Sequence, residues 1–404
     1  MHCTKGLEGL QALPDTPARA QQKLDLLITR ATALQITKGY AAPDVGHAWS
    51  CARELCRQVG DTPRLYEAVA GLGVFYQNRG DHQTARDLGE HNLALAQRLH
   101  DAVLLLRAHY WLGTVLYYLG EFAAAHGHLD QASALPQQED APTFHHAPSG
   151  APHLAHVAFV LWMLGYLEQA LSKLRAMLTY ARGLSHPYNL ARALHYAATL
   201  YGLRREWSTA QEHAAASLAL STEQGFVQWV GLAMLSQGRA RTVQGQGEAG
   251  IAEMRQGLAL HQATGAVHGR SASLIRLAEA YGGMGQVEEG LGLLAEALAH
   301  VDTTGERYWE AELYRLKGEL LLRQATPDTL QAAACFQEAL VVARRQQAKS
   351  WELRATMSLS RLWQQQGKQA EAHELLAPSY GWFTEGVDTA DLQEAKALLE
   401  ELAG

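Results

Sequence analysis

Apolar and polar residues follow the helical period of about 3.6 residues along most of the chain. The stretch between Gly265 and Gly305 shows the pattern most clearly. Each half has an apolar face, made of Leu274, Leu277, Ala278 and Tyr281 in the first and Val287, Leu291, Leu294 and Leu298 in the second. Gly285 lies between the halves, where a glycine lets a helix end in the left-handed conformation without a Cβ penalty. We predict a helical hairpin whose apolar stripes must be covered by neighbouring hairpins.

This hairpin recurs with a period of about 40 residues, which is typical of a repeat array. Its turns fall at Gly80, Gly120, Gly165, Arg205, Gly245, Gly285, Thr326 and Gly367. Small residues lie about two helical turns before them, at Gly73, Gly113, Ala158, Ala198, Gly238, Ala278, Gly318 and Ser360. Small residues also follow most turns, at Ala85, Ala125, Ala170, Ala210, Gly250, Gly290 and Ala372. Small residues at both places let two helices cross at close range.

The predicted fold class is all-α: a right-handed α-solenoid of about nine helix pairs plus a C-terminal capping helix. The prolines between 136 and 152 cannot continue a helix, so they interrupt the period with a surface loop that is also rich in histidine. The predicted divisions of this single array (1–404) are degenerate N-terminal repeats at 1–61, regular repeats at 62–135, the loop at 136–152, regular repeats at 153–386 and the capping helix at 387–404.

The N-terminal segment has two interpretations. Residues 3–13 carry Leu7, Leu10 and Leu13 on one side, as the second helix of an earlier hairpin would. The chain would then be a fragment of a longer protein, and its uncapped start could self-associate, because repeat arrays normally protect their ends with polar caps. A short disordered leader fits the same residues.

Composition excludes several classes of protein. A net charge of −7 argues against general binding to nucleic acid, which needs a clustered positive field. The four cysteines are too few and too scattered for a disulfide scaffold. The longest apolar run, Val157 to Leu167, is about half of the roughly 20 residues that a membrane span requires. With no signal-peptide pattern, we expect a cytoplasmic protein with reduced thiols and no membrane contact.

Chemical motifs predict neither an enzyme nor a cofactor. Gly245, Gly247 and Gly250 spell GxGxxG, but a helix precedes them where a dinucleotide site needs a strand, and the repeat pattern explains two of the glycines. Neither a phosphate-binding GxxxxGK[ST] loop nor a GxSxG nucleophile elbow is present. His145, His146 and neighbouring acids around the loop lack the spacing of a zinc site, so no metal is predicted.

The inner wall of the solenoid is the predicted functional surface, because the first helix of each unit lines the concave side. The residues that we place on this wall are Arg107, Tyr110, Trp111, Thr114, Tyr117, His156, Phe159, Trp162, Arg192, His195, Tyr196, Arg239, Arg276, Glu279, Arg315, Glu319, Arg354 and Arg361. The wall is aromatic in its first half and arginine-rich in its second, and both residue types anchor partner segments. The alternative is that the aromatic rings pack into neighbouring units and the arginines pair with nearby glutamates.

The positions of the small residues resemble the tetratricopeptide repeat, in a form longer than the usual 34 residues. Segments such as ERYWEAELYRLKGELLLR and SWELRATMSLSRLWQQQGK, and the ending LLAPSYGWFTEGVDTADLQEAKALLEEL, resemble the C-terminal repeats of a bacterial family. In that family a nucleotide cyclase or kinase domain and an ATPase domain precede the repeats. The resemblance implies a non-catalytic regulatory scaffold that binds a protein or peptide in its concave groove. A domain that senses a small-molecule effector is the alternative.

Overall fold

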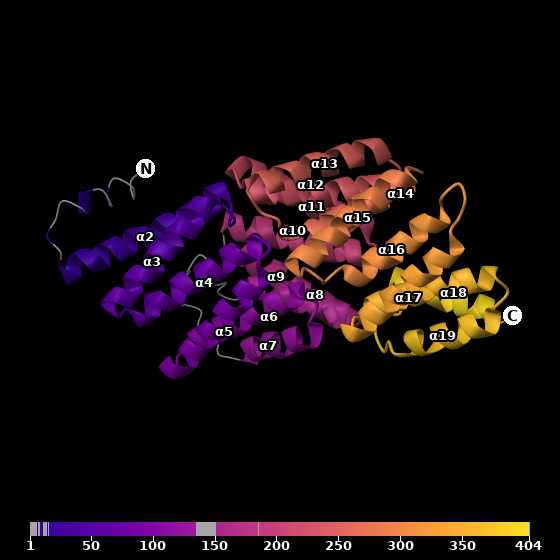
Figure 1. Cartoon of the computed structure of the whole chain (residues 1–404), viewed down its shortest axis with the longest axis horizontal. Helices are drawn as coiled ribbons and strands as arrows, with labels where there is room; N and C mark the ends of the chain where they lie inside the picture. Colours follow the sequence, from indigo (N-terminus) through magenta and orange to yellow (C-terminus); the bar gives the residue numbers. More distant parts are fainter. Residues whose placement is uncertain are drawn as a thin grey trace.

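The computed structural model describes residues 6, 9–10, 14, 16–134, 151–184 and 186–403. Over these residues the chain forms nineteen helices, α2 to α20, and no strand (Figure 1). The helices of the first half are α2 (Pro17–Lys38), α3 (Pro43–Val59), α4 (Thr62–Asn78), α5 (His82–Leu99), α6 (Ala102–Tyr118), α7 (Phe122–Ala134), α8 (Ala151–Met163), α9 (Leu167–Gly183), α10 (Pro187–Leu203) and α11 (Trp207–Gln224). Those of the second half are α12 (Val227–Val243), α13 (Gly247–Ala263), α14 (Arg270–Gly283), α15 (Val287–Thr304), α16 (Glu310–Leu322), α17 (Thr329–Arg345), α18 (Lys349–Gln365), α19 (Gln369–Gly381) and α20 (Ala390–Leu402).

The helices pack as nine consecutive hairpins, from α2–α3 to α18–α19, and α20 covers the end of the last one. The prediction of an all-α solenoid is therefore confirmed, whereas its handedness stays a prediction. The N-terminal segment and the loop lie mostly outside the described residues. One boundary differs, because α8 begins at Ala151, inside the predicted loop. Pro152 does not prevent this, since the first turn of a helix tolerates proline. Within the described part of the chain, no helix is long and apolar enough to cross a membrane.

The predicted turn glycines have the left-handed backbone that glycine adopts easily, whereas the predicted turn residue Thr326 does not. Gly80, Gly120, Gly245 and Gly285 all have φ between 76° and 89°, in the left-handed region. Arg205 takes the same place with φ 65°, an unfavourable conformation for a residue with a side chain. Its guanidinium donates a hydrogen bond of 2.6 Å to Glu394.

The small residues mark the places where the two helices of a hairpin touch. A Cβ added to Gly238 in α12 would lie 2.6 Å from the carbonyl oxygen of Gly250 in α13, and the reverse substitution would bring atoms to 2.5 Å. Gly231 and Gly257 make an equivalent contact further along the same two helices. Packing thus accounts for Gly250 in the GxGxxG motif, which joins two helices and has no preceding strand.

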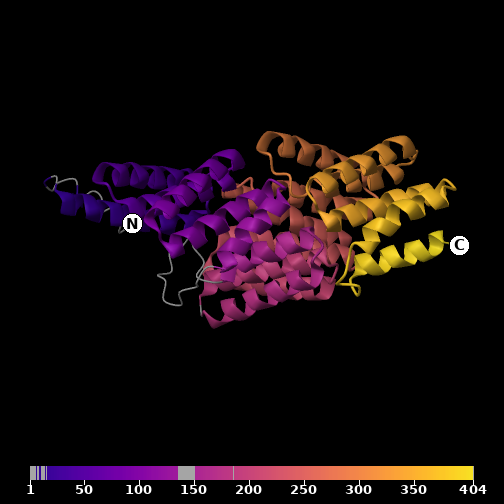
Figure 2. The same ribbon diagram turned by 90° about the horizontal axis from the view of Figure 1, so that it is seen from below.

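The second half of the array docks onto the first half along one continuous line of contacts, which we call the seam (Figures 1 and 2). The backbone N–H of Val267 donates to the carbonyl of Asn78 at 2.9 Å, and that of Arg307 donates to the carbonyl of Tyr118 at 2.8 Å. Each acceptor is the last residue of the first helix in its hairpin, where carbonyl groups have no partner within the helix. Both donors lie in loops that connect two hairpins of the second half.

The seam continues toward the C-terminus through two further hydrogen bonds. The Ser350 hydroxyl donates to the carbonyl of Trp162, which lies 188 residues earlier. The guanidinium of Arg354 donates to the carbonyl of Leu203 at 2.6 Å and also contacts Asp391 at 2.7 Å. Because the seam brings the later repeats over the inner wall of the earlier ones, the wall becomes partly enclosed instead of forming an open groove.

Candidate functional site

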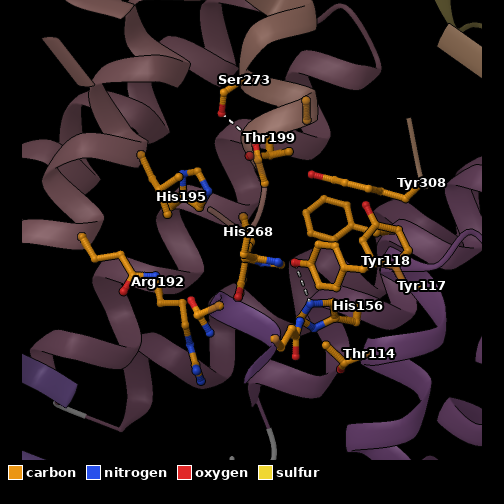
Figure 3. Close-up of a pocket in the computed structure, with 18 of the residues that line it drawn as sticks. Thr114, Tyr117, Tyr118, His156, Arg192, His195, Thr199, His268, Ser273 and Tyr308 are labelled. Carbon is orange, nitrogen blue, oxygen red and sulfur yellow. Dashed lines mark hydrogen bonds between the residues drawn. The ribbon is translucent and has the colours of Figure 1, made fainter. Parts of the chain in front are cut away.

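The inner faces of the first helices surround a cavity of about 170 Å³ that we call the aromatic cavity. Ten of the predicted wall residues line it, which places the aromatic half of the predicted wall in one space: Tyr110, Trp111, Thr114, Tyr117, His156, Phe159, Arg192, His195, Tyr196 and Arg276. They come from α6, α8, α10 and α14, which face one another across the interior (Figure 3).

Ring contacts hold the aromatic side chains in fixed positions. Tyr117 stacks on Phe159 with ring centroids 6.0 Å apart, and Tyr196 meets the edge of Phe159 at 5.8 Å. His156 accepts or donates a hydrogen bond of 3.2 Å through its Nδ1 with the hydroxyl of Tyr110. Burial raises the pKa of Tyr117, so the hydroxyl is neutral at physiological pH. These contacts therefore fix the wall. Its weakly polar ring faces suit an aromatic ring or an uncharged apolar group.

The charged side chains that line the aromatic cavity are both arginines among the described residues. Arg192 and Arg276 line it, and no aspartate or glutamate does so among the described residues. The guanidinium of Arg276 lies 4.7 Å from the ring centre of Trp309, and its Nε has no hydrogen-bond partner. Burial, followed by the charge of Arg239, lowers the pKa of Arg276 to about 10, so it stays charged. A charge held in this way is costly unless something pairs with it.

Several other polar atoms on the wall have no partner. They are Nδ1 of His195, Oγ1 of Thr199, Oε1 of Gln228 and Nε2 of His261. Burial and the nearby charge of Arg276 lower the pKa of His195 to about 3, and burial lowers that of His261 to about 4. Both imidazoles are consequently neutral at physiological pH. Buried polar atoms in native proteins normally bind protein, water or ligand, so the cavity offers donors and acceptors to a ligand.

The arginine-rich half of the predicted wall lines a second space, which we call the arginine cavity. Six predicted residues are in it: Arg239, Glu279, Arg315, Glu319, Arg354 and Arg361. Here the contacts agree with the alternative interpretation, because each of the four predicted arginines has a carboxylate partner. Arg239 pairs with Glu279 at 2.8 Å, and Arg361 pairs with Glu394 at 3.3 Å. Arg315 contacts both Glu312 and Glu319 on its own helix.

Two predicted wall residues lie outside both cavities. Trp162 is 2% exposed and packs edge-to-face against Trp351, at 4.8 Å between ring centroids. Arg107 is 8% exposed and lies over the ring of Tyr66 at 5.3 Å. Both side chains pack against a helix of another repeat unit, because these helices are buried on more than one face. The structure therefore does not place them on the surface of either cavity, and their role in binding stays a prediction.

Sequence reasoning missed the residues that the seam adds to the aromatic cavity. Tyr308 and Trp309 arrive from the loop before α16, and His268 arrives from the loop before α14. Figure 3 shows Tyr308 and His268 next to Tyr118, and the ring centroids of His268 and Tyr118 are 4.1 Å apart. These residues lie in loops between hairpins, so helical periodicity contains no signal for them. Only the docking of the two halves brings them together.

The neutral histidines predict a loss of stability in acid. In the unfolded chain a histidine has a pKa near 6.5, whereas the pKa values of folded His195 and His261 are lower. Below about pH 6.5 the unfolded state therefore binds protons at these two residues and the folded state does not, which favours unfolding. We expect the free energy of unfolding to fall by about 2 kcal/mol per histidine between pH 7 and pH 5. Urea titrations at both pH values measure this change. The His195→Gln/His261→Gln double variant should lose less stability over the same interval; an equal loss would contradict the assignment.

Comparison with known proteins identifies the repeat type. Residues 61–138 match the family model of the tetratricopeptide repeat. An uncharacterized protein of Rhizobium meliloti (strain 1021) is 26% identical over 210 residues, which cover 52% of this chain and 20% of that protein. The chain thus spans about a fifth of the length of the curated relative that it matches.

Two solved structures have a similar arrangement of helices. A Rap protein complexed with competence and sporulation factor superposes with a TM-score of 0.62 and 14% identity, over 85% of this chain and 91% of that chain. A signal-transduction ATPase with a tetratricopeptide-repeat sensor, from Pyrococcus horikoshii, gives 0.48 and 15% identity, over 95% of this chain and 54% of that one. Residues 61–138 are therefore tetratricopeptide repeats, and the described chain is an all-α solenoid of tetratricopeptide-like hairpins.

Proposed function

We propose that this chain is a non-catalytic sensing scaffold, the regulatory module of a bacterial signalling ATPase or nucleotide cyclase. It binds a segment of a protein partner on its inner wall. The aromatic cavity carries this proposal, because it combines fixed aromatic faces with two arginines and contains no carboxylate among the described residues. The Rap protein with the similar fold was solved with competence and sporulation factor, so in that protein the fold holds a partner.

The volume of the aromatic cavity limits what enters it. An α-helix with its side chains is about 10 Å across, whereas an apolar cavity of about 150 Å³ holds a molecule of the size of benzene. A cavity of about 170 Å³ therefore takes one large side chain or chain end, not a whole helix. The partner segment lies across the wall and inserts a single anchor group.

The chemistry of the wall specifies this anchor. Tyr117, Phe159 and Tyr196 offer ring faces and edges to an aromatic or apolar body. Arg192 and Arg276 offer donors to an acidic group, and Arg–carboxylate hydrogen bonds are among the stronger ones in proteins. The arginine cavity lacks this preference, because carboxylates that line it already pair with most of its arginines. The anchor is an aromatic side chain next to a carboxylate, such as an aspartate, a glutamate or a free C-terminus.

A second candidate function is the sensing of a small-molecule effector. The partial enclosure of the aromatic cavity by the seam favours this function. A small aromatic acid could bury most of its surface in such a cavity without being part of a peptide. The two candidates share the same chemistry at the site and differ in whether a peptide chain contributes to affinity.

An array of short synthetic peptides separates the candidates. We expect the labelled protein to bind peptides that place an aromatic residue beside an acidic group and to ignore their amide-capped or Asn/Gln counterparts. Quenching of tryptophan fluorescence by benzoate or phenyl phosphate, with benzyl alcohol as the neutral control, tests the small-molecule route. Binding of the free acids without binding of any peptide supports the effector function. Binding of neither class contradicts both.

Arginine variants test whether Arg192 and Arg276 bind the ligand or stabilise the fold. In Arg192→Met and Arg276→Met, we expect affinity for the best peptide to fall at least tenfold each, because a charge-assisted hydrogen bond contributes about 1.5–3 kcal/mol. Methionine keeps the length and packing of the side chain. The melting temperature of the free protein should stay constant or rise, because each variant removes a half-buried charge that forms no ion pair with a carboxylate among the described residues.

The matched control is Arg182→Met, which removes an exposed arginine on the outer helix α9. It should change neither peptide affinity nor the melting temperature. A clear loss of stability in Arg192→Met or Arg276→Met, together with unchanged peptide affinity, would mean that these arginines are structural.

A further inference from the structure

A cluster of histidines surrounds one buried carboxylate beside the seam. Glu306, in the loop after α15, is fully buried. Its Oε2 lies 3.7 Å from Nε2 of His82 and 3.8 Å from Nδ1 of His268, and its Oε1 lies 3.8 Å from Nε2 of His300. One potential ligand atom from each of His82, His268 and Glu306 lies within 4.8 Å of the other two. The three residues come from chain segments that meet only because the two halves dock.

The facing nitrogen atoms have no other partner. His82 is fully buried, and neither of its ring nitrogens forms a hydrogen bond. Nδ1 of His268 and Nε2 of His300 are likewise buried and without a hydrogen bond. Separations of 3.7–3.8 Å are too long for hydrogen bonds to Glu306. Buried nitrogen atoms that face one point and have no hydrogen-bond partner indicate that an ion or another group binds there.

Backbone capping by Glu306 explains only part of this arrangement. Oε1 accepts from the N–H and the hydroxyl of Ser271, and Oε2 accepts from the N–H of Gly269 at 2.6 Å. Oε2 therefore keeps a lone pair on the side of His82 and His268. Among the described residues no lysine or arginine pairs with Glu306, so its negative charge lacks a permanent cation.

We propose that His82, His268 and Glu306 bind a divalent transition-metal ion, with Zn²⁺ as the best match. Two imidazole nitrogens and one carboxylate oxygen are a known ligand set for Zn²⁺, in which bonds of about 2.0–2.2 Å place neighbouring ligand atoms about 3–4 Å apart. The fourth position is left to water, and the unpartnered Nε2 of His300, 3.8 Å from Oε1 of Glu306, lies on the same side of the cluster.

The position of this site gives the ion a structural role. His82 opens α5 in the first half of the array, whereas His268 and Glu306 belong to loops of the second half. The hydrogen bond from Val267 to Asn78 lies next to His268 in the sequence. A bound ion therefore ties the two halves together across the seam, beside the aromatic cavity that His268 also lines.

Metal titration of the full chain tests the site directly. After treatment with a chelator, we expect the protein to bind one equivalent of Zn²⁺ in calorimetry. Co²⁺ should give the visible absorption bands of a four- or five-coordinate site. Added Zn²⁺ should raise the melting temperature and slow amide exchange around residues 267–271, because binding to the folded state alone stabilises it. X-ray absorption of the Zn²⁺ complex should show two imidazoles and an oxygen ligand.

Variants locate the ion. His82→Gln and His268→Gln should weaken Zn²⁺ binding by more than the 10–100-fold that loss of an outer-shell partner typically causes. The control is His128→Gln, which disrupts another close histidine pair, with Nδ1 atoms of His109 and His128 2.9 Å apart. It should leave the one-equivalent site intact.

Several outcomes would overturn the metal site. One is the absence of stoichiometric binding in the wild-type protein, which would leave Glu306 only its role as a cap for the backbone at Gly269 and Ser271. Another is binding that is unchanged in both His82→Gln and His268→Gln, which would place the ion elsewhere. If either variant failed to fold, X-ray absorption of the wild-type complex would decide, and a spectrum without imidazole scattering would exclude the site.

Discussion

Replacement of Gly238 by valine is expected to lower the free energy of unfolding by about 3 kcal/mol, because overpacking of a close helix contact forces the backbones apart. The first added carbon would already lie 2.6 Å from the carbonyl oxygen of Gly250 and 2.6 Å from Cγ of Met254. Backbone atoms cannot move aside as a flexible side chain can. The α12–α13 hairpin would have to open, and its neighbours on both sides would lose contact.

The matched control for this prediction is Gly292→Ala. Gly292 lies exposed on α15, and a Cβ added there meets nothing within 4 Å. Alanine should stabilise the helix by about 0.5–1 kcal/mol, because glycine loses more backbone entropy on folding. Urea titration gives the global change, and hydrogen exchange shows whether the damage is concentrated in α12 and α13. Equal effects of the two substitutions would show that the helices are not in close contact at Gly238.

Replacement of Trp162 by alanine is expected to destabilise the protein by about 3–5 kcal/mol, the range for large aromatic residues in a core. Trp162 is 2% exposed, meets Trp351 edge-to-face at 4.8 Å, and has the guanidinium of Arg354 5.3 Å from its ring centre. The cavity left behind would adjoin the seam, so we expect the docking of α18 on α8 to weaken as well.

This substitution also distinguishes the core position from the wall position that the sequence suggested. Trp382→Ala is the comparison, because Trp382 is 37% exposed and should cause a clearly smaller loss. Thermal unfolding and near-ultraviolet circular dichroism report the difference. Unchanged stability of Trp162→Ala with loss of peptide binding would restore Trp162 to the binding wall. An alanine scan of the wall should otherwise omit Trp162, because unfolding would imitate a binding defect.

Local patterns predicted the repeating unit well. Apolar periodicity located the helices, and glycines such as Gly120 and Gly285 located the turns, because left-handed backbone is a property of single residues. The small residues that allow close crossings were also identified from spacing alone, as Gly238 and Gly250 show. These features depend on interactions within one hairpin, so a short stretch of sequence contains all the information about them.

The binding wall was predicted only in part. Helical phase selected Tyr117 and Arg276, which line the aromatic cavity, and also Trp162, which packs in the core. The phase alone could not separate a cavity from a core. It also could not show that Arg239 forms an ion pair with Glu279 while Arg276 forms none among the described residues, because such partners come from other units.

By itself, the sequence determined the all-α class, the hairpin unit, the turn positions and the absence of a strand before the GxGxxG motif. Tertiary structure decided which wall residues share a cavity, which arginines line it without a carboxylate among the described residues, and how His82, His268 and Glu306 meet. The physical reason is the seam, which joins carbonyls such as that of Asn78 to loops nearly half a chain length away. Contacts over that separation depend on the accumulated twist of many units, and no local residue pattern specifies it.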